Sequence, residues 1–308
     1  MKEEVVPPGA SLARTPSALA LVSGGSGLKE PGRPLLRWHG GKWLLAPWII
    51  EHFPPHRIYV EPFGGAASVL LRKPRSYAEV YNDLDDDAVN LFEVLRGPRA
   101  TELIYGIIHT PFARTEFKRA YEETPDPVEK ARRLIIRFQG FGSDGHNGAR
   151  PTGFRAASNR SGTTPAHDWN NYPDHLERII RRLEGVCIEC RPAMEVMAQQ
   201  DGPQTLHYVD PPYVHSTRST AHNSTRKNYR HEMSDADHAQ LLDFLRTLKG
   251  MVVLSGYPHP TYDAALSDWT RVERPALADG ARARTEVLWI NPEAARPIRR
   301  NLFGDVSA

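Results

Sequence analysis

The sequence predicts an α/β protein with a mostly parallel, doubly wound sheet and a smaller, mainly helical and loop-rich domain inserted into it. Short apolar runs alternate with helix-like segments over residues 35–96, and the alternation resumes over residues 176–308. Alternating strands and helices build parallel sheets with right-handed crossovers. The alternation is missing over residues 97–175, which are therefore expected to form the inserted domain.

The composition limits the class of protein. The 308 residues are 40% hydrophobic and 25% charged, as in soluble globular chains. The formal net charge is +2, so any nucleic-acid surface must be a local basic patch. The apolar stretches are too short to span a membrane, and two cysteines in so long a chain are typical of a reducing cytoplasm. Cys187 and Cys190 form a lone Cys-x-x-Cys without further ligands at zinc spacing, so a cytoplasmic protein with no membrane partner and no metal is expected.

The first elements are expected in the order strand, helix, strand, helix. Residues 1–34 precede them as a disordered tail, because Pro, Gly, Ser and Ala occur there without periodicity. A strand at 57–61 is followed by a glycine turn and by a helix that opens at Ala66. A second strand at 78–81 precedes a helix at 85–96, whose first turn is acidic, as the helix dipole favours.

The inserted domain is expected to begin with helices, one of them at 129–138, and to continue as a loop-rich stretch at 139–165. Arginines and phenylalanines are interleaved in that stretch, and a loop of this length in a compact domain is typically functional. The sheet then resumes. Its remaining elements are expected as a helix at 174–183, strands at 186–190, 205–209, 251–255 and 285–290, and a helix that begins at Ser234 with a capping box to Asp237.

The tetrapeptide Asp210-Pro211-Pro212-Tyr213 directly follows the expected strand at 205–209. Two prolines cannot continue a central strand, so the chain turns rigidly at the carboxyl edge of the sheet, where ligands bind in open α/β folds. An acid, a stiff turn that presents a carbonyl and a flat ring match the needs of an exocyclic amino group on a planar base. An ordinary Asp-Pro turn with a packing tyrosine is the alternative.

Two glycine turns are further candidates for a ligand site. Phe63-Gly64-Gly65 lets the backbone approach a ligand closely, and Asp83 ends the next strand, where the ribose of a nucleotide is usually held. Tight packing of helix on sheet explains these glycines nearly as well. Trp38 and Lys42 flank the other turn, which can bring an ammonium group to a carboxylate or phosphate. A solvated lysine at the start of a helix is the alternative there.

Taken in order, Trp38-x-Gly-Gly-Lys42, Glu61-Pro-Phe-Gly-Gly65, Asn82-Asp83 and Asp210-Pro-Pro-Tyr213 resemble the motifs of the Dam-type, D12 class DNA adenine-N6 methyltransferases. The resemblance covers roughly residues 35–291. It implies a Rossmann-like, S-adenosylmethionine-binding catalytic domain over 35–96 and 176–308. It also implies a DNA target-recognition domain over 97–175, with double-stranded DNA as the partner.

The resemblance implies roles for single residues. The catalytic residues are expected to be Asp210, Pro211, Pro212 and Tyr213, and S-adenosylmethionine is expected to contact Trp38, Lys42, Phe63, Gly64, Gly65, Asp83 and Asp210. Ala67 departs from the family's pattern, because the turn usually has a further glycine at this position. Its methyl group is a candidate obstacle to the cofactor.

The chemistry then follows from the delocalised N6 lone pair of adenine, which is a poor nucleophile. Hydrogen bonds from the amino group to the Asp210 carboxylate and the Pro211 carbonyl would localise the lone pair and aim it at the methyl donor. The base must leave the duplex, and Tyr213 is expected to stack on it. The basic residues of two loops and of the helix before the first are expected to contact DNA: Arg137, Arg150, Arg155, Arg160, Arg218, Arg226, Lys227 and Arg230.

Other hypotheses stay open at this point. One is a methyltransferase that acts on cytosine N4, RNA or a protein amide. Another is an inactive DNA-binding relative, on account of Ala67. A nucleotide-dependent oxidoreductase would leave the Pro-Pro-Tyr turn without a role. The residues do not specify the DNA recognition sequence, a restriction or phage context, or the oligomeric state.

Overall fold

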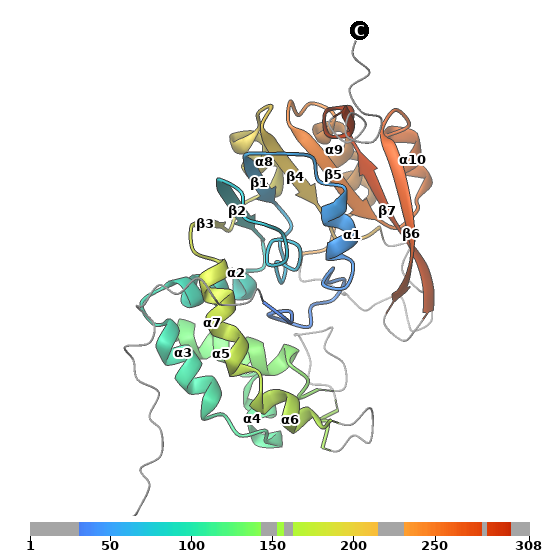
Figure 1. Cartoon of the computed structure of the whole chain (residues 1–308). Helices are drawn as coiled ribbons and strands as arrows, with labels where there is room; N and C mark the ends of the chain where they lie inside the picture. The colour runs from blue at the N-terminus through green and yellow to red at the C-terminus, as the bar shows by residue number, and fades with distance from the viewer. Residues whose placement is uncertain (1–30, 143–152, 157–162, 215–230, 279–281, 297–308) are drawn as a thin grey trace, which may run out of the picture.

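The computed structural model describes residues 31–142, 153–156, 163–214, 231–278 and 282–296 (Figure 1). No helix within these ranges is long and apolar enough to cross a membrane. The elements are, in chain order, α1 (Ala46–Glu51), β1 (Ile58–Glu61), β2 (Ala78–Asn82), α2 (Asp86–Arg96), α3 (Ala100–Ile108), α4 (Arg114–Arg119), α5 (Pro127–Phe138), α6 (Pro165–Asn170), α7 (Pro173–Arg182), β3 (Val186–Glu189), α8 (Ala193–Gln200), β4 (Thr205–Val209), α9 (Asp235–Leu245), β5 (Met251–Gly256), α10 (Pro260–Ala265), β6 (Thr270–Ala278) and β7 (Arg282–Ile290).

These strands form one sheet of seven with the order β3-β2-β1-β4-β5-β7-β6. The pairs from β3 to β5 are parallel, and β7 is antiparallel to both β5 and β6. The mostly parallel sheet predicted from the sequence is therefore confirmed. The strand β4 lies between β1 and β5, and all five of its residues are buried, as expected of a central strand covered on both faces.

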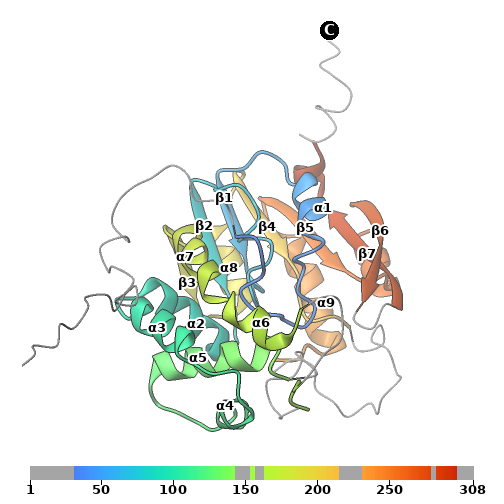
Figure 2. The same ribbon diagram turned by 60° about the horizontal axis from the view of Figure 1, so that its bottom comes forward.

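Helices cover both faces of the sheet. Alternate residues of β5 point to opposite sides: Met251 and Val253 belong to the apolar cluster that includes α1 and α7, whereas Val252 and Leu254 pack with α8, α9 and α10. Figure 2 shows α1 and α7 in front of the sheet and α8 and α9 behind it. The doubly wound arrangement is thus confirmed.

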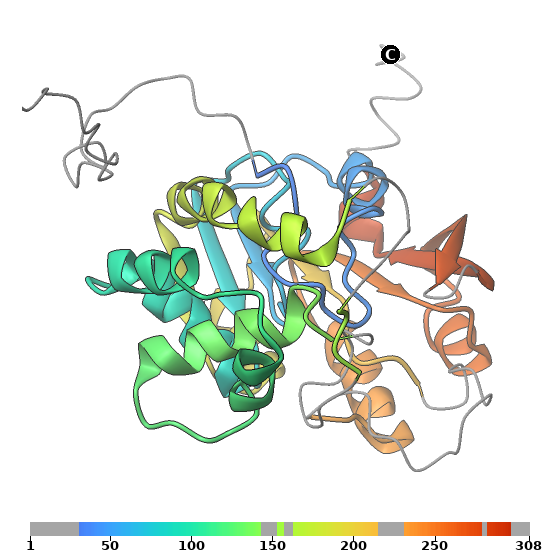
Figure 3. The ribbon, with the colours of Figure 1, turned by 90° about the horizontal axis from the view of Figure 1, so that it is seen from below.

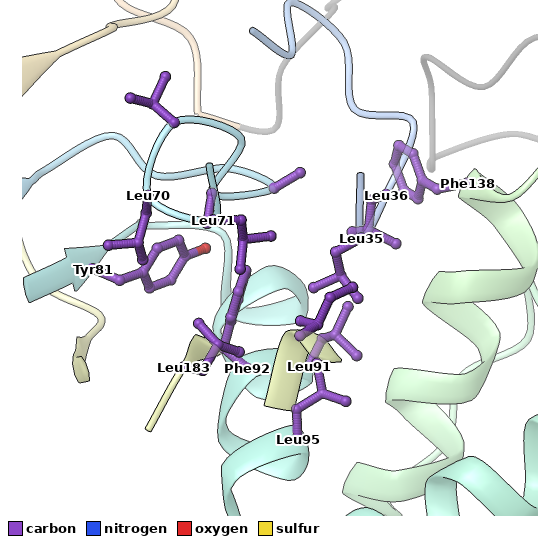
Figure 4. Packing of buried hydrophobic residues seen from close by; sticks show 14 of the residues in the cluster. Leu35, Leu36, Leu70, Leu71, Tyr81, Leu91, Phe92, Leu95, Phe138 and Leu183 are labelled. Carbon is purple, nitrogen blue, oxygen red and sulfur yellow. The ribbon is translucent and has the colours of Figure 1, made fainter. Parts of the chain in front are cut away.

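The helices between β2 and β3 form a group at one end of the sheet, below it in Figure 1 and toward the viewer in Figure 3. The helix α5 packs against α2, α3 and α4, and α3 also contacts α7. The segment before α1 joins this group to the sheet. Leu35 and Leu36 are buried in the same cluster as Leu91 and Phe138, and Figure 4 shows these side chains together. The Leu35 carbonyl accepts hydrogen bonds from the Gln139 amide at 2.6 Å and from the Tyr172 hydroxyl at 2.8 Å.

The boundary expected between residues 175 and 176 falls inside α7 (Pro173–Arg182), and Arg33 lies within the expected tail. The Arg33 guanidinium donates a hydrogen bond to the Gln139 side chain at 3.3 Å. The chain therefore enters the helical group just before the sheet begins.

Two local expectations were wrong. The segment that begins at Ala66 forms consecutive turns up to residue 72 instead of a helix. Ala67 has a φ of 52°, and the Leu70 N–H donates to the Glu61 carboxylate at 2.9 Å, so neither residue continues a helical pattern. The last strand, β7, begins at Arg282 instead of 285, because its first three residues pair with the last three residues of β6, which end at Ala278. By contrast, the capping box of Ser234 and Asp237 is present at the start of α9.

Candidate active site

A cavity of about 850 Å³ lies at the carboxyl edge of the parallel sheet. Its wall includes Glu61 at the end of β1, Asp83 after β2 and Asp210 after β4. Parallel strands direct their carboxyl ends to one edge, which is where open α/β folds bind ligands. The structure brings all seven predicted cofactor residues together in this wall: Trp38, Lys42, Phe63, Gly64, Gly65, Asp83 and Asp210. Pro211 and Pro212 also line it.

The Asp210 carboxylate is held by one donor on each oxygen. The Ser255 hydroxyl of β5 donates to Oδ1 at 2.8 Å, and the Lys42 ammonium lies 2.9 Å from Oδ2. Ser255 in turn shares a hydrogen bond of 3.0 Å with the Tyr208 hydroxyl. Each carboxylate oxygen has a second lone pair, so Asp210 can accept a further hydrogen bond from a ligand without losing these partners.

Lys42 is only 4% exposed, which excludes the solvated lysine considered from the sequence. Its ammonium donates to the Gly40 carbonyl at 2.8 Å and lies 4.7 Å from the centre of the Tyr213 ring. A buried ammonium is stable only when charges or dipoles replace its water. The carboxylate of Asp210, the carbonyl of Gly40 and the face of Tyr213 supply them.

Tyr213 is 8% exposed and lies beneath Lys42, and it is not among the residues that line the cavity. Its hydroxyl donates to Glu286 Oε2 of β7 at 3.1 Å, and its ring meets that of Tyr257 edge-on at 4.4 Å. In this arrangement Tyr213 supports the lysine, whereas the two prolines before it face the ligand space.

The turn after β1 requires its glycines. A Cβ at Gly64 would lie 2.2 Å from the Tyr81 ring. Gly65 has a φ of 47°, and a Cβ there would lie 2.7 Å from Trp38 Nε1. Trp38 is stacked on Phe138 of α5, with ring centroids 5.0 Å apart. The backbone of the turn is thus packed between Tyr81 and Trp38.

Asp83 is held by the backbone of the same turn. Its Oδ2 accepts a hydrogen bond of 2.7 Å from the Gly65 N–H, and its Oδ1 accepts one of 2.8 Å from the Asp85 N–H. Burial raises the pKa of Asp83 above its ordinary value, although both N–H groups oppose this shift. The carboxylate is therefore fixed at the cavity wall, and its oxygens can each accept a further hydrogen bond from a ligand.

Sequence reasoning missed Glu61 as a site residue. Glu61 is 2% exposed, lines the cavity, and accepts hydrogen bonds from the Tyr59 hydroxyl at 2.6 Å and from the Leu70 N–H at 2.9 Å. Burial raises the pKa of Glu61 to about 8, and the nearby charge of Asp210 acts in the same direction. The sequence did contain a sign of this role, because Glu61 is an acid that ends an apolar strand shortly before the glycine turn.

Of the residues predicted to bind DNA, the structure describes two. Arg137 lines the cavity from α5 and pairs with Asp87 at 3.0 Å. Arg155 lies beside Arg37: a Cβ at Gly140 would be 3.4 Å from Arg155 Nη1 and 3.2 Å from Arg37 Nη1. The other predicted residues lie outside the described ranges: Arg150, Arg160, Arg218, Arg226, Lys227 and Arg230.

Among the described residues, the cysteine pair and one group of neighbouring acids are the places to look for a metal site. Cys187 and Cys190 are exposed free thiols at the end of the edge strand β3. Cys187 lies within β3 and Cys190 directly follows it. Asp85, Asp86 and Asp87 place their carboxylates together at the start of α2. Asp85 caps this helix, and Lys130 pairs with both Asp86 and Asp87. Helix capping and ion pairs thus account for the acidic group.

A mostly parallel sheet whose carboxyl edge brings a glycine turn, the acid Asp83 and the Asp210-Pro211-Pro212 turn to one cavity is typical of α/β enzymes that methylate amino groups. The family model described as D12 class N6 adenine-specific DNA methyltransferase matches residues 38–271, and the chain belongs to this family.

Named relatives agree with this assignment. The chain is 25% identical to DNA adenine methylase of Escherichia coli K12 over 194 residues, which cover 60% of the chain and 66% of the relative. It is 22% identical to DNA adenine methylase of Salmonella typhimurium over 292 residues, or 88% of the chain and all of the relative. It is 23% identical to Type II methyltransferase M.MjaIII of Methanocaldococcus jannaschii over 239 residues, or 70% of the chain and 80% of the relative.

Proposed function

We propose that this protein transfers the methyl group of S-adenosylmethionine to N6 of an adenine that has rotated out of double-stranded DNA. The observation that carries the proposal is the position of Asp210. Its carboxylate follows β4, is oriented by Lys42 and Ser255, and faces the same cavity as the glycine turn and Asp83.

The cavity fits a cationic nucleoside cofactor. Its volume of about 850 Å³ is within the range of small-molecule sites. Carboxylates line it, among them Asp83 and Asp210, and negative groups favour a ligand that carries a sulfonium and an ammonium. Asp83 would bind the ribose hydroxyls, and Trp38 and Lys42 would lie along the methionine end. The bound cofactor supplies an electrophilic methyl group.

The residues at the end of β4 act on the adenine. Asp210 accepts a hydrogen bond from one N6–H and the Pro211 carbonyl accepts one from the other, which draws the lone pair out of the ring and points it along the line of attack. Because Ser255 and Lys42 hold the carboxylate before the base arrives, little reorientation is needed during the reaction. Pro212 keeps the turn rigid.

DNA would approach from the side of the helical group. Arg155 and Arg37 place two guanidinium groups beside Gly140, which is a suitable arrangement for a phosphate. The chain's net charge of +2 means that such local groups, and not the whole surface, would supply the attraction. We propose residues 97–175 as the part that recognises the target, because these helices border the cavity through Arg137 and Phe138.

The direct test is transfer of tritium from labelled S-adenosylmethionine to duplex DNA, followed by nucleoside analysis. Label in N6-methyladenine is expected from the wild-type chain and is expected to be absent for Asp210→Ala. Asp268→Ala is the control, since Asp268 is an exposed acid that pairs with Arg246 away from the cavity. Label in N4-methylcytosine, RNA or protein would contradict the proposal.

The inactive relative considered from the sequence depended on Ala67. Ala67 is fully buried in the apolar cluster and is absent from the residues that line the cavity. Because the methyl group of Ala67 lies outside the cavity, it leaves the space for the cofactor unobstructed. Isothermal calorimetry with S-adenosylmethionine tests the point directly, and a chain that does not bind it would favour the inactive relative.

A further inference from the structure

Glu286 is a buried acid for which neither the sequence motifs nor the cavity gives a role. It is 6% exposed and lies on β7. The last pair between β7 and β5 joins Val287 to Gly256, so Glu286 is the first residue of β7 beyond the carboxyl end of β5. At this edge of the sheet it is a close neighbour of the Asp210 turn.

A chain of contacts connects Glu286 to the reacting end of the site. Glu286 Oε2 accepts the Tyr213 hydroxyl at 3.1 Å. The Tyr213 ring lies 4.7 Å below the Lys42 ammonium, and this ammonium lies 2.9 Å from Asp210 Oδ2. The contacts thus run from a glutamate on β7, through an aromatic ring and a lysine, to the carboxylate that faces the ligand.

The electrostatics support a link between Glu286 and Lys42. Burial raises the pKa of Glu286, the positive charge of Lys42 lowers it, and the negative charge of Asp210 raises it again. The carboxylates of Glu286 and Asp210 therefore both interact with the ammonium of Lys42. Burying an acid without a partner is costly, and Tyr213 and Lys42 are the partners that make this position tolerable.

The neighbouring aromatic ring limits how Tyr213 can move. Tyr257 packs edge-on against Tyr213, and the Arg284 guanidinium lies 4.8 Å from the centre of the Tyr257 ring. Arg284 and Glu286 are alternate residues of β7. Strand β7 therefore contacts both tyrosines: the Arg284 guanidinium lies over the Tyr257 ring, and the Glu286 carboxylate accepts the Tyr213 hydroxyl.

We propose that Glu286 is a positioning residue for methyl transfer, which holds the Tyr213 ring in place and through it keeps Lys42 against Asp210. The proposal rests on the proposed function, because it concerns the same reaction. Glu286 does not line the cavity, so its effect is expected on the rate of the bound complex rather than on the binding of DNA.

The test is a set of steady-state measurements with duplex DNA and labelled cofactor on Glu286→Ala, Glu286→Gln, Tyr213→Phe and the double variant Tyr213→Phe/Glu286→Ala. For Glu286→Ala, kcat is expected to fall about 10-fold to 100-fold, as for loss of a charged hydrogen bond, while KM for DNA changes by less than about twofold. Glu286→Gln is expected to recover most of this loss, since its amide oxygen still accepts the Tyr213 hydroxyl. The double variant is expected to be no slower than the slower single variant.

Glu273→Gln is the matched control, because it removes an exposed charge from the neighbouring strand β6 and is expected to keep wild-type kcat. Wild-type kcat in Glu286→Ala, or effects of Tyr213→Phe and Glu286→Ala that multiply in the double variant, would overturn the inference. If Glu286→Ala does not fold, the kcat of Tyr213→Phe is the deciding measurement. A Tyr213→Phe chain with wild-type kcat overturns the inference. A wild-type chain that transfers no methyl group overturns the proposed function as well, which distinguishes the two failures.

Discussion

The ammonium of Lys42 and the carboxylate of Asp210 form an ion pair of 2.9 Å with side chains that are only 5% and 17% exposed. Lys42 comes from the segment before the first helix, and Asp210 follows the central strand β4. The pair therefore joins two distant parts of the chain at the position where the reaction is proposed to occur.

Replacing one member of this pair leaves the other charge buried. Lys42→Met is expected to lower the free energy of unfolding by about 2–4 kcal/mol, somewhat less than for a fully buried pair because Asp210 keeps some contact with water. Urea unfolding measures this change. The double variant Lys42→Met/Asp210→Asn is expected to regain at least half of the loss. Simple addition of the two single effects would show that the residues do not interact.

Ser255 holds the other oxygen of Asp210. Ser255→Ala removes a buried donor at 2.8 Å and is expected to cost about 1–2 kcal/mol of stability. The rate of methyl transfer is expected to fall about tenfold, because the Asp210 carboxylate loses one of the two donors that fix its orientation. Tyr208→Phe, which leaves the Ser255 hydroxyl in place, is expected to have a smaller effect on kcat. A larger loss in Tyr208→Phe would show that the tyrosine hydroxyl is the more important group.

Ala67 has a positive φ, yet its methyl group faces the apolar cluster and not the cavity. Ala67→Gly is therefore expected to leave the Kd for S-adenosylmethionine within about twofold. Its stability is expected to change by less than about 1 kcal/mol, because relief of the left-handed backbone and loss of a buried methyl group nearly cancel. Calorimetry and urea unfolding provide the two values. Tenfold tighter binding would mean that the methyl group does obstruct the cofactor.

Glu61 makes stability depend on pH. The unfolded glutamate ionises near its ordinary pKa of 4.5, whereas burial keeps the folded side chain protonated up to a pKa of about 8. Its contribution to stability is therefore complete below pH 4.5 and is lost as the pH rises toward 8. The free energy of unfolding of Glu61→Gln, measured by urea unfolding, is expected to rise relative to that of the wild type by about 1–3 kcal/mol as the pH increases from 5 to 8. A pH-independent difference would place the charged form in the folded protein.

Arg155 is expected to contact a DNA phosphate. Arg155→Ala is expected to weaken DNA binding and to reduce the slope of log K against log salt by about 0.9, as for the loss of one phosphate contact. Fluorescence anisotropy over a range of salt concentrations measures this slope. Arg246→Ala is the control, because Arg246 pairs with Asp268 at the far end of α9. An unchanged slope for Arg155→Ala would remove this residue from the DNA surface.

The central part of the fold was predictable because each strand ends in a distinctive signal. β1 precedes two glycines, β2 precedes Asp83, and β4 precedes two prolines. The strand β6 was missed because Arg271, Glu273 and Pro275 interrupt any apolar pattern. An edge strand tolerates such residues, since one side needs no partner.

The sequence predicted only those site residues that belong to recognisable motifs. Lys42, Asp83 and Asp210 were expected to meet at one edge of a parallel sheet, and the cavity contains all three. Ser255 and Glu286 could not be found this way, because their contacts depend on which strands lie beside β4. A glutamate inside the apolar strand at 285–290 was nevertheless a usable sign, since acids are rarely buried without a partner.

The place of β4 in the sheet has a consequence for the newly made chain on the ribosome. β1 pairs with β2 on one side and with β4 on the other, yet β4 is translated well after β2 and β3. One side of β1 therefore stays without hydrogen-bond partners while residues 83–204 emerge, a condition that invites association with other nascent chains. Co-translational chaperones would act on this protein mainly during that interval.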